Sequence, residues 1–253
     1  NDSESDDEEN KGNKVMSRLV EEGVLGALAA IVKSDDENLK TNSAALLALL
    51  CTEEEKVRRE TGGQAMSLVA ALAGQNLANE SARQYCVDAL HALAADPMSR
   101  YLLNDPQVIS GTGLGGINSL GILLNLAENA ESQHTEVLIA RTLYYIANGV
   151  PDEAKSGGTP TELQMYQDQN GQVNESVHAL AMSENLVPLL RILASNCRDR
   201  TQPMMLMAVI RSVSWDRDAA PNLVNLGIVG LLTQLIDAVQ GDQGMSYAAR
   251  LDC

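Results

Sequence analysis

The sequence predicts an all-α fold built from stacked helical repeats. Three observations support this prediction: apolar residues recur at helical spacing, a short motif returns along the chain, and strand-like segments are scarce. The hydrophobic share is 45%, aromatic residues make up 3%, and the chain has no Phe. This composition favours helices that pack through small and straight-chain side chains, whereas a β-sandwich needs more aromatic and β-branched residues.

A motif consisting of a small or turn-forming residue followed by an apolar helix recurs along the chain. Its anchor residues are Gly23, Gly63, Gly116, Asn185 and Gly227. These anchors are separated by 40, 53, 69 and 42 residues, and the interval of 69 contains a polar insertion at 151–176. Without the insertion, the underlying period is roughly 40 to 45 residues, which is typical of two- or three-helix solenoid repeats.

A second and stronger helix is predicted between successive anchors. The stretches 42–52 (NSAALLALLCT) and 136–149 (EVLIARTLYYIANG) are apolar nearly all round, as expected for helices covered by neighbours on both sides. In 82–96, i, i+3 and i+4 spacing predicts one buried face. That face consists of Ala82, Tyr85, Cys86, Ala89, Leu90 and Leu93. Only residues 107–110 (QVIS) have the pattern of a strand.

Composition also divides the chain into segments. Residues 1–14 begin with six acidic residues in the first ten, and we expect a solvated, disordered tail there. Residues 15–240 form the predicted repeat domain, with about four repeats and the start of a fifth. The insertion at 151–176 is either disordered or a binding loop, and residues 241–253 are an incomplete repeat or a tail.

The net charge restricts the class of partner. The chain carries 18 Lys and Arg against 34 Asp and Glu, which gives a formal charge of −16. A strongly acidic protein repels phosphate backbones and anionic lipid headgroups, so the sequence argues against nucleic acid and membrane partners.

The cysteines indicate a reducing compartment. Cys51, Cys86, Cys197 and Cys253 show neither C-x-x-C pairing nor metal-ligand spacing, and the first two lie within apolar helical stretches. The sequence shows no N-terminal signal and no run of 18 apolar residues. We therefore expect a cytoplasmic protein, with the nucleus as a second location.

Gly111, Gly113 and Gly116 match the spacing G-x-G-x-x-G, which in a βαβ unit binds the pyrophosphate of a dinucleotide. The same glycines have a second explanation, because Gly116 coincides with the turn that begins each repeated motif. The segment after them, 136–149, is too long for the second strand of a βαβ unit and continues a helical pattern. We therefore favour the turn over a nucleotide site.

No other pattern indicates catalysis or a cofactor. His91, His134 and His178 are scattered and lack the spacing of zinc ligands. A G-x-S-x-G nucleophile elbow is also missing from the sequence. We expect neither a metal nor an organic cofactor.

The chain resembles the armadillo-repeat family over about residues 15–240. The resemblance is carried by LVEEG (19–23) and LVNLG (223–227), by the helices that follow them, and by A-L-x-x-L-A endings such as 89–94. It implies a right-handed superhelix of three-helix repeats whose third helices line a concave groove that binds proteins. Family members that clamp extended peptides do so with an asparagine ladder. Aligning the third helices places other residues at the ladder positions: Leu49, Ala92, Tyr145 and Ser212.

The sequence thus predicts a non-catalytic scaffold or adaptor that binds partner proteins along a helical groove. The candidate groove residues are Asp88, His91, Arg141, Tyr145, Arg211 and Trp215. Tyr, Trp and Arg are the residue types that anchor interfaces, although both aromatic residues can also serve packing between repeats. Two alternatives remain: a co-chaperone similar to the UCS family of myosin chaperones, and a nucleotide-dependent enzyme that uses residues 111–116.

Overall fold

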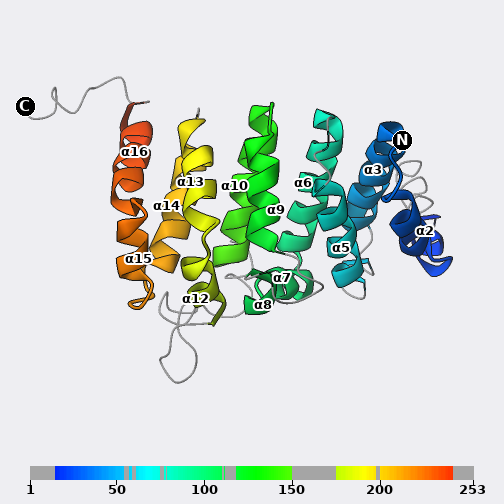
Figure 1. The fold of residues 1–253 in the computed structure, drawn as a ribbon, viewed down its shortest axis with the longest axis horizontal. Coiled ribbons are helices and arrows are strands. Elements are labelled where there is room, and N and C mark those ends of the chain that lie inside the picture. Colours follow the sequence, from blue (N-terminus) through cyan, green and yellow to red (C-terminus); the bar gives the residue numbers. More distant parts are fainter. Residues whose placement is uncertain are drawn as a thin grey trace, which may run out of the picture. The chain divides into compact units, whose positions relative to one another are not determined.

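A computed structural model describes residues 15–53, 57–58, 61–74, 77, 79–109, 111, 118–149, 175–197 and 200–241. All regular secondary structure in these residues is helical, which confirms the predicted all-α class (Figure 1). The chain divides into two compact units, Asn1–Leu102 and Leu103–Cys253, called unit 1 and unit 2 below.

Unit 1 is built from helices whose starts are marked by polar caps. After the helical residues 15–21 it contains α2 (Val24–Ile31), α3 (Glu37–Glu53), α5 (Gly62–Ala73), α6 (Glu80–Ala95) and most of α7 (Pro97–Leu103). The Asp36 carboxylate accepts the N–H of Asn38 at 2.8 Å, and the Asn79 side chain accepts the N–H of Ser81 at 2.8 Å. These bonds satisfy donors that a helix start leaves open.

In unit 1, helices that are separated by about one predicted period pack against each other. α2 contacts α5, and α3 lies along α6, while α5 also contacts α3 and α6. The predicted buried face of α6 is largely confirmed: Ala82, Cys86, Ala89, Leu90 and Leu93 are at most 1% exposed, and Tyr85 is half-buried. α3 is less covered than its sequence suggested, because Leu49 is 42% exposed.

Unit 2 begins with a short helix and two longer ones. These are α8 (Pro106–Ile109), α9 (Ser119–Glu128) and α10 (Gln133–Asn148). The side chain of Asn118 caps α9 by accepting the N–H of Gly121 at 2.7 Å, and the Ser132 hydroxyl caps α10 by accepting the N–H of Thr135 at 3.1 Å. The remaining helices are α12 (Glu175–Met182), α13 (Leu186–Ser195), α14 (Thr201–Val213), α15 (Ala220–Asn225) and α16 (Ile228–Gly241).

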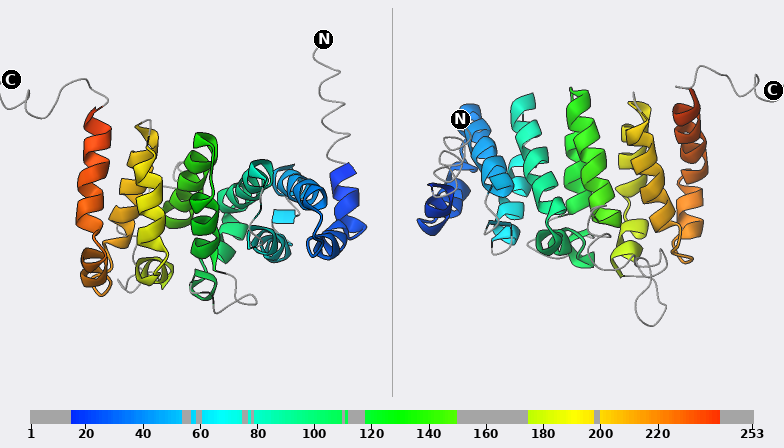
Figure 2. Two further views of the ribbon diagram at one scale, coloured as in Figure 1. Left: turned by 45° about the horizontal axis from the view of Figure 1, so that its top comes forward. Right: turned by 180° about the vertical axis from the view of Figure 1, so that it is seen from behind.

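The helices of unit 2 form three rows. In the first row α12 contacts α8 and α15; in the second, α13 contacts α9 and α16; in the third, α10 contacts α14. Figures 1 and 2 show the corresponding columns standing side by side, with α9 and α10 first, then α13 and α14, then α16. Each helix of a row therefore buries its apolar side against its counterpart about one predicted period away.

Two of the predicted turn glycines adopt the left-handed conformation. Gly23 has φ 83° and Gly227 has φ 88°, and each immediately precedes a helix, as expected for glycine in a tight turn. Gly63 differs, because it lies inside α5, which begins one residue earlier. The recurring motif therefore marks the positions of helices such as α2, α5 and α16. Its glycine, however, does not adopt the same backbone conformation at each site.

The strand-like pattern at 107–110 does not form a strand at residues 107–109, which belong to α8. The Asp105 carboxylate accepts the N–H of Gln107 at 2.7 Å, and Pro106 is the first helical residue, where its missing N–H has no cost. The tail 1–14, insertion residues up to 174, and residues 242–253 lie outside the described residues, so the expectations for them remain predictions. Glu175 and Ser176, the end of the predicted insertion, begin α12.

Candidate functional site

Burial follows one pattern along the long helices α6, α10 and α14. In each helix, a residue of greater accessibility lies between two pairs of buried residues. Two further accessible residues lie three and four positions after it. The first position is held by Asp88, Arg141 and Arg211. The second is held by His91, Tyr144 and Ser214, and the third by Ala92, Tyr145 and Trp215. Since three and four residues complete about one helical turn, these positions form one face of each helix.

Hydrogen bonds support this register between α10 and α14. Thr142 and Ser212 are both buried, and each hydroxyl donates to the carbonyl four residues earlier: Leu138 at 2.8 Å and Ala208 at 2.9 Å. Arg141 therefore corresponds to Arg211, and Tyr145 corresponds to Trp215.

The register corrects the ladder alignment made from sequence. That alignment paired Ser212 with Tyr145, yet Ser212 is 1% exposed and its hydroxyl also contacts the side-chain oxygen of Asn148 on α10. A helix turns by about 100° per residue, so a misplaced register moves a side chain from the exposed face into the helix–helix contact. Leu49 in turn corresponds to Asp88 rather than to Ala92, because the buried pairs of α3 and α6 match only in that register.

In unit 2, the accessible positions of α10 and α14 make up what we call the α10–α14 face. It consists of Arg141, Tyr144, Tyr145, Arg211 and Trp215, carried by two helices that pack against each other. Arg211 is exposed, Trp215 is 38% exposed, and the other three are half-buried. The rings of Tyr144 and Tyr145 are 6.1 Å apart and tilted by 59°. The face therefore combines two guanidinium groups with three aromatic rings.

The other two candidate residues lie in unit 1, on α6. Asp88 is half-buried and accepts a hydrogen bond from the Gln84 amide at 2.9 Å, while His91 is half-buried one turn later. The exposed residues at the equivalent positions of α3 are Leu49, Thr52 and Glu53. This face of unit 1 is therefore acidic and polar, in contrast to the α10–α14 face of unit 2.

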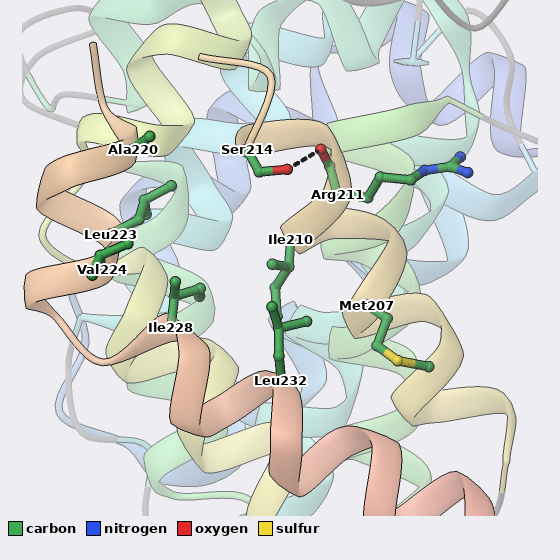
Figure 3. Close-up of a pocket in the computed structure, with 9 residues that line it drawn as sticks. All are labelled: Met207, Ile210, Arg211, Ser214, Ala220, Leu223, Val224, Ile228 and Leu232. Carbon is green, nitrogen blue, oxygen red and sulfur yellow. Dashed lines mark hydrogen bonds between the residues drawn. The ribbon is translucent and has the colours of Figure 1, made fainter. Parts of the chain in front are cut away.

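An apolar cavity of about 290 Å³ lies between α14, α15 and α16. Figure 3 shows its lining: Met207, Ile210, Arg211, Ser214, Ala220, Leu223, Val224, Ile228 and Leu232. In this view the Arg211 guanidinium points away from the apolar side chains, and the Ser214 hydroxyl donates to the Arg211 carbonyl at 2.8 Å. The lining thus offers little polar chemistry to a ligand.

A histidine–carboxylate pair also lies in unit 2, and the sequence analysis did not find it. Nδ1 of His178 is 2.6 Å from Oδ2 of Asp216, although 38 residues separate them. The His178 side chain is 51% exposed and that of Asp216 is 3% exposed. Within the described ranges no hydroxyl or thiol hydrogen-bonds to His178, so the described residues do not complete a catalytic triad at this pair.

The glycine motif is only partly visible in the structure. Gly111 has φ 75°, whereas Gly113 and Gly116 lie outside the described residues. The residues that precede Gly111 form α8 rather than the strand that a dinucleotide-binding turn follows. The described part of the motif therefore lacks its required context.

In the described parts of the chain, no three His, Cys, Asp or Glu side chains gather as a metal site would require. No single described helix is long and apolar enough to cross a bilayer; α12 and α13 satisfy length and composition only as a pair, across a 70° bend.

No protein-family model, curated protein or solved structure matches the chain.

Proposed function

We propose that the chain is a non-catalytic scaffold or adaptor that binds a partner protein through the α10–α14 face of an armadillo-like solenoid. The three rows of unit 2 and the paired helices of unit 1 support the solenoid, because contact between each helix and its counterpart is the packing rule of repeat proteins. Such packing leaves the outer side of α10 and α14, the third row of unit 2, accessible to a partner protein.

One observation carries the binding role. Equivalent positions on neighbouring helices hold the same chemistry, an arginine at the first position and an aromatic ring at the third. Arg, Tyr and Trp are enriched among the residues that contribute most to protein–protein binding. Trp215 also remains 38% exposed, although burying it would be favourable in the free protein.

The chemistry of the face suggests the chemistry of the partner. Arg141 and Arg211 are basic positions in a chain of net charge −16. Guanidinium groups pair best with carboxylates, and aromatic rings contribute apolar contact area. The proposed partner therefore presents a segment in which acidic side chains alternate with apolar ones.

Location forms part of the same proposal. Cys51 and Cys86 are free thiols buried in the core of unit 1, and free core cysteines suit a reducing compartment. We accordingly place the protein in the cytoplasm or the nucleus.

Affinity capture with quantitative mass spectrometry tests the binding role. We expect Arg211→Glu/Trp215→Ala to reduce recovery of the main partner by about tenfold or more, because loss of one interface anchor costs about 2 kcal/mol. Lys33→Glu/Val15→Ala makes the same kind of change at exposed residues of unit 1 and serves as the control. Equal recovery with both variants would show that the α10–α14 face does not bind the partner.

A further inference from the structure

The second-row helices of unit 2 differ in how well one apolar stripe is covered. In α13 the stripe is buried, whereas in α16 the residues 42 positions later are 57% exposed at Val229, half-buried at Leu232 and 44% exposed at Ile236. Both stripes are apolar, so the α16 stripe is exposed because no described helix covers it. The buried stripe of α13 consists of Val187, Leu190 and Ala194.

The surface beside this stripe has a filled counterpart one repeat earlier. α10, α12 and α13 hold the row positions of α14, α15 and α16, and α14 contacts all three of these earlier helices. In the first turn of α14, the Gln202 amide donates to the Leu193 carbonyl of α13 at 3.0 Å. In its last turn, the Ser212 hydroxyl contacts the Asn148 side chain of α10. A helix therefore fills the earlier groove from end to end.

The groove between α14, α15 and α16 is hollow where its counterpart is filled. An apolar cavity of about 290 Å³ lies there, lined by Ile210 of α14, Leu223 of α15 and Leu232 of α16 among other residues (Figure 3). Met204 on α14 and Val224 on α15 are also more than half exposed. A hollowed apolar groove between helices is the kind of surface that binds the apolar face of a further helix.

The buried side of α14 indicates which helix fits such a groove. Leu206, Val209 and Val213 are all 0% exposed, and they follow one another at spacings of three and four. This spacing places them on one face of the helix. An amphipathic helix with large apolar residues at i, i+3 and i+7 thus matches the groove.

Charge adds a second requirement. Of the residues that line the cavity, Arg211 alone is charged. A carboxylate on the bound helix would complement it. A second copy of the chain would bring a net charge of −16 to a protein of the same charge, and this repulsion opposes self-association. The charges therefore favour a helix from another protein.

The earlier groove also indicates where the carboxylate belongs. Met205 lies seven residues before Ser212 on α14, and Arg141 lies seven residues before Asn148 on α10. Since Ser212 contacts Asn148, Met205 is level with Arg141, the counterpart of Arg211. A bound helix therefore meets Arg211 at the position that Met205 holds in α14.

We propose that the groove between α14, α15 and α16 binds an amphipathic helix of a partner protein, which covers the apolar stripe of α16 and places a carboxylate beside Arg211. The inference rests on the proposed scaffold function and specifies one kind of segment that the scaffold binds. The cavity receives large apolar side chains of that helix and is not a small-molecule site.

Fluorescence anisotropy with a labelled peptide tests this groove in the 253-residue chain. The peptide has the sequence of residues 201–216 with Met205→Glu, so it carries the stripe that fills the earlier groove and the carboxylate. A scrambled peptide of the same composition controls for nonspecific adsorption. We expect the ordered peptide to bind about tenfold more tightly and to gain helix on binding, because so short a helix is marginal in water alone. Absence of binding, or equal binding of the two peptides, would overturn the proposal.

Two variants of the protein locate the bound peptide. Ile236→Asp places a charge in the stripe of α16 and should weaken binding by about tenfold. Leu39→Asp makes the same kind of change in unit 1, where Leu39 is 42% exposed, and should leave binding unchanged. Because both side chains are already exposed, neither variant should disturb folding. Equal effects of the two variants would show that the peptide binds elsewhere.

A charge reversal on the peptide tests the contact with Arg211. The peptide with Met205→Lys should bind about fivefold more weakly than the peptide with Met205→Glu, and Arg211→Gln in the protein should abolish the difference. Equal binding of both peptides to the wild type would contradict the acidic contact.

Other occupants of the groove give distinct results. A dimer of the chain that Ile236→Asp dissociates would show by sedimentation that a second copy covers the groove. Tighter peptide binding after deletion of residues 242–253 would show that the chain's own segment covers it. Either result would overturn the proposal. The peptide assay needs no natural partner, so its failure is distinguishable from failure of the scaffold function, which affinity capture measures.

Discussion

Asp216 joins three segments of unit 2 through a single buried side chain. One carboxylate oxygen lies 2.6 Å from Nδ1 of His178 on α12, and the other accepts the N–H groups of Asp218 and Ala219 at 2.9 and 3.1 Å. The carboxylate thus caps the approach to α15 while it binds α12. The Asp216 side chain is 3% exposed. Removing its carboxylate would leave the backbone donors without an acceptor in a place that water hardly reaches, and this is costly.

We predict that Asp216→Ala lowers the free energy of unfolding by about 2 kcal/mol, since it removes a buried carboxylate that accepts two backbone N–H groups and also binds His178. His178→Ala should cost less than about 1 kcal/mol, because the His178 side chain is half-exposed and the cap remains. Urea denaturation of both variants measures the difference. Equal costs would show that the capping bonds contribute little.

The buried thiols of unit 1 should make stability sensitive to alkaline pH. Burial raises the pKa of Cys51 and Cys86 from 9.0 to about 12, and the Asp88 carboxylate adds to the effect at Cys86. Above about pH 9 the unfolded chain releases thiol protons that the folded chain keeps, so stability falls as the pH rises from about 9 to about 12.

Comparison of the wild type with Cys51→Ala/Cys86→Ala checks this effect. We expect the wild type to lose more of its free energy of unfolding than the variant between about pH 8 and about pH 10, because only the wild type carries the two linked protons. Parallel pH profiles would show that both thiols are more accessible than their burial indicates.

At the scale of elements, local signals decided where helices begin. Asp105 and Pro106 form a helix start that overrides the β-branched residues Val108 and Ile109, and the buried side chains of these residues pack equally well from a helix. Those two residues suggested a strand, although the start signal immediately before them was present in the sequence. A start signal of this kind is more informative than the propensity of a four-residue segment.

Two glycines at the start of α2 should respond in opposite ways to alanine. Gly23 has φ 83°, so Gly23→Ala forces a left-handed alanine and should cost about 1 kcal/mol. Gly26 lies inside α2 with no atom within 4 Å of an added Cβ, so Gly26→Ala should stabilise by about 0.5 to 1 kcal/mol. Thermal unfolding measures both. A stabilising Gly23→Ala would contradict the left-handed turn.

At the scale of the whole molecule, each unit draws its stability from contacts between neighbouring helices. Leu90 is 1% exposed on α6, which packs against α3 and α5. Leu90→Ala should destabilise by about 3 kcal/mol, through lost burial and a residual cavity. Hydrogen exchange should show the largest loss of protection in α3, α5 and α6. An equal loss in α9, α13 and α16 would show that units 1 and 2 open together.

Periodicity alone determined the all-helical class, the positions of most helices and the buried face of α6, because the spacing of apolar residues is a property of one helix at a time. The register between helices was decided only in the tertiary structure. Ser212 appeared on the exposed face in the sequence alignment but lies buried against Asn148. Likewise, 38 residues separate His178 from Asp216, and no local pattern connects them. Such contacts depend on how neighbouring helices are rotated and offset, and that is settled by side-chain packing between them.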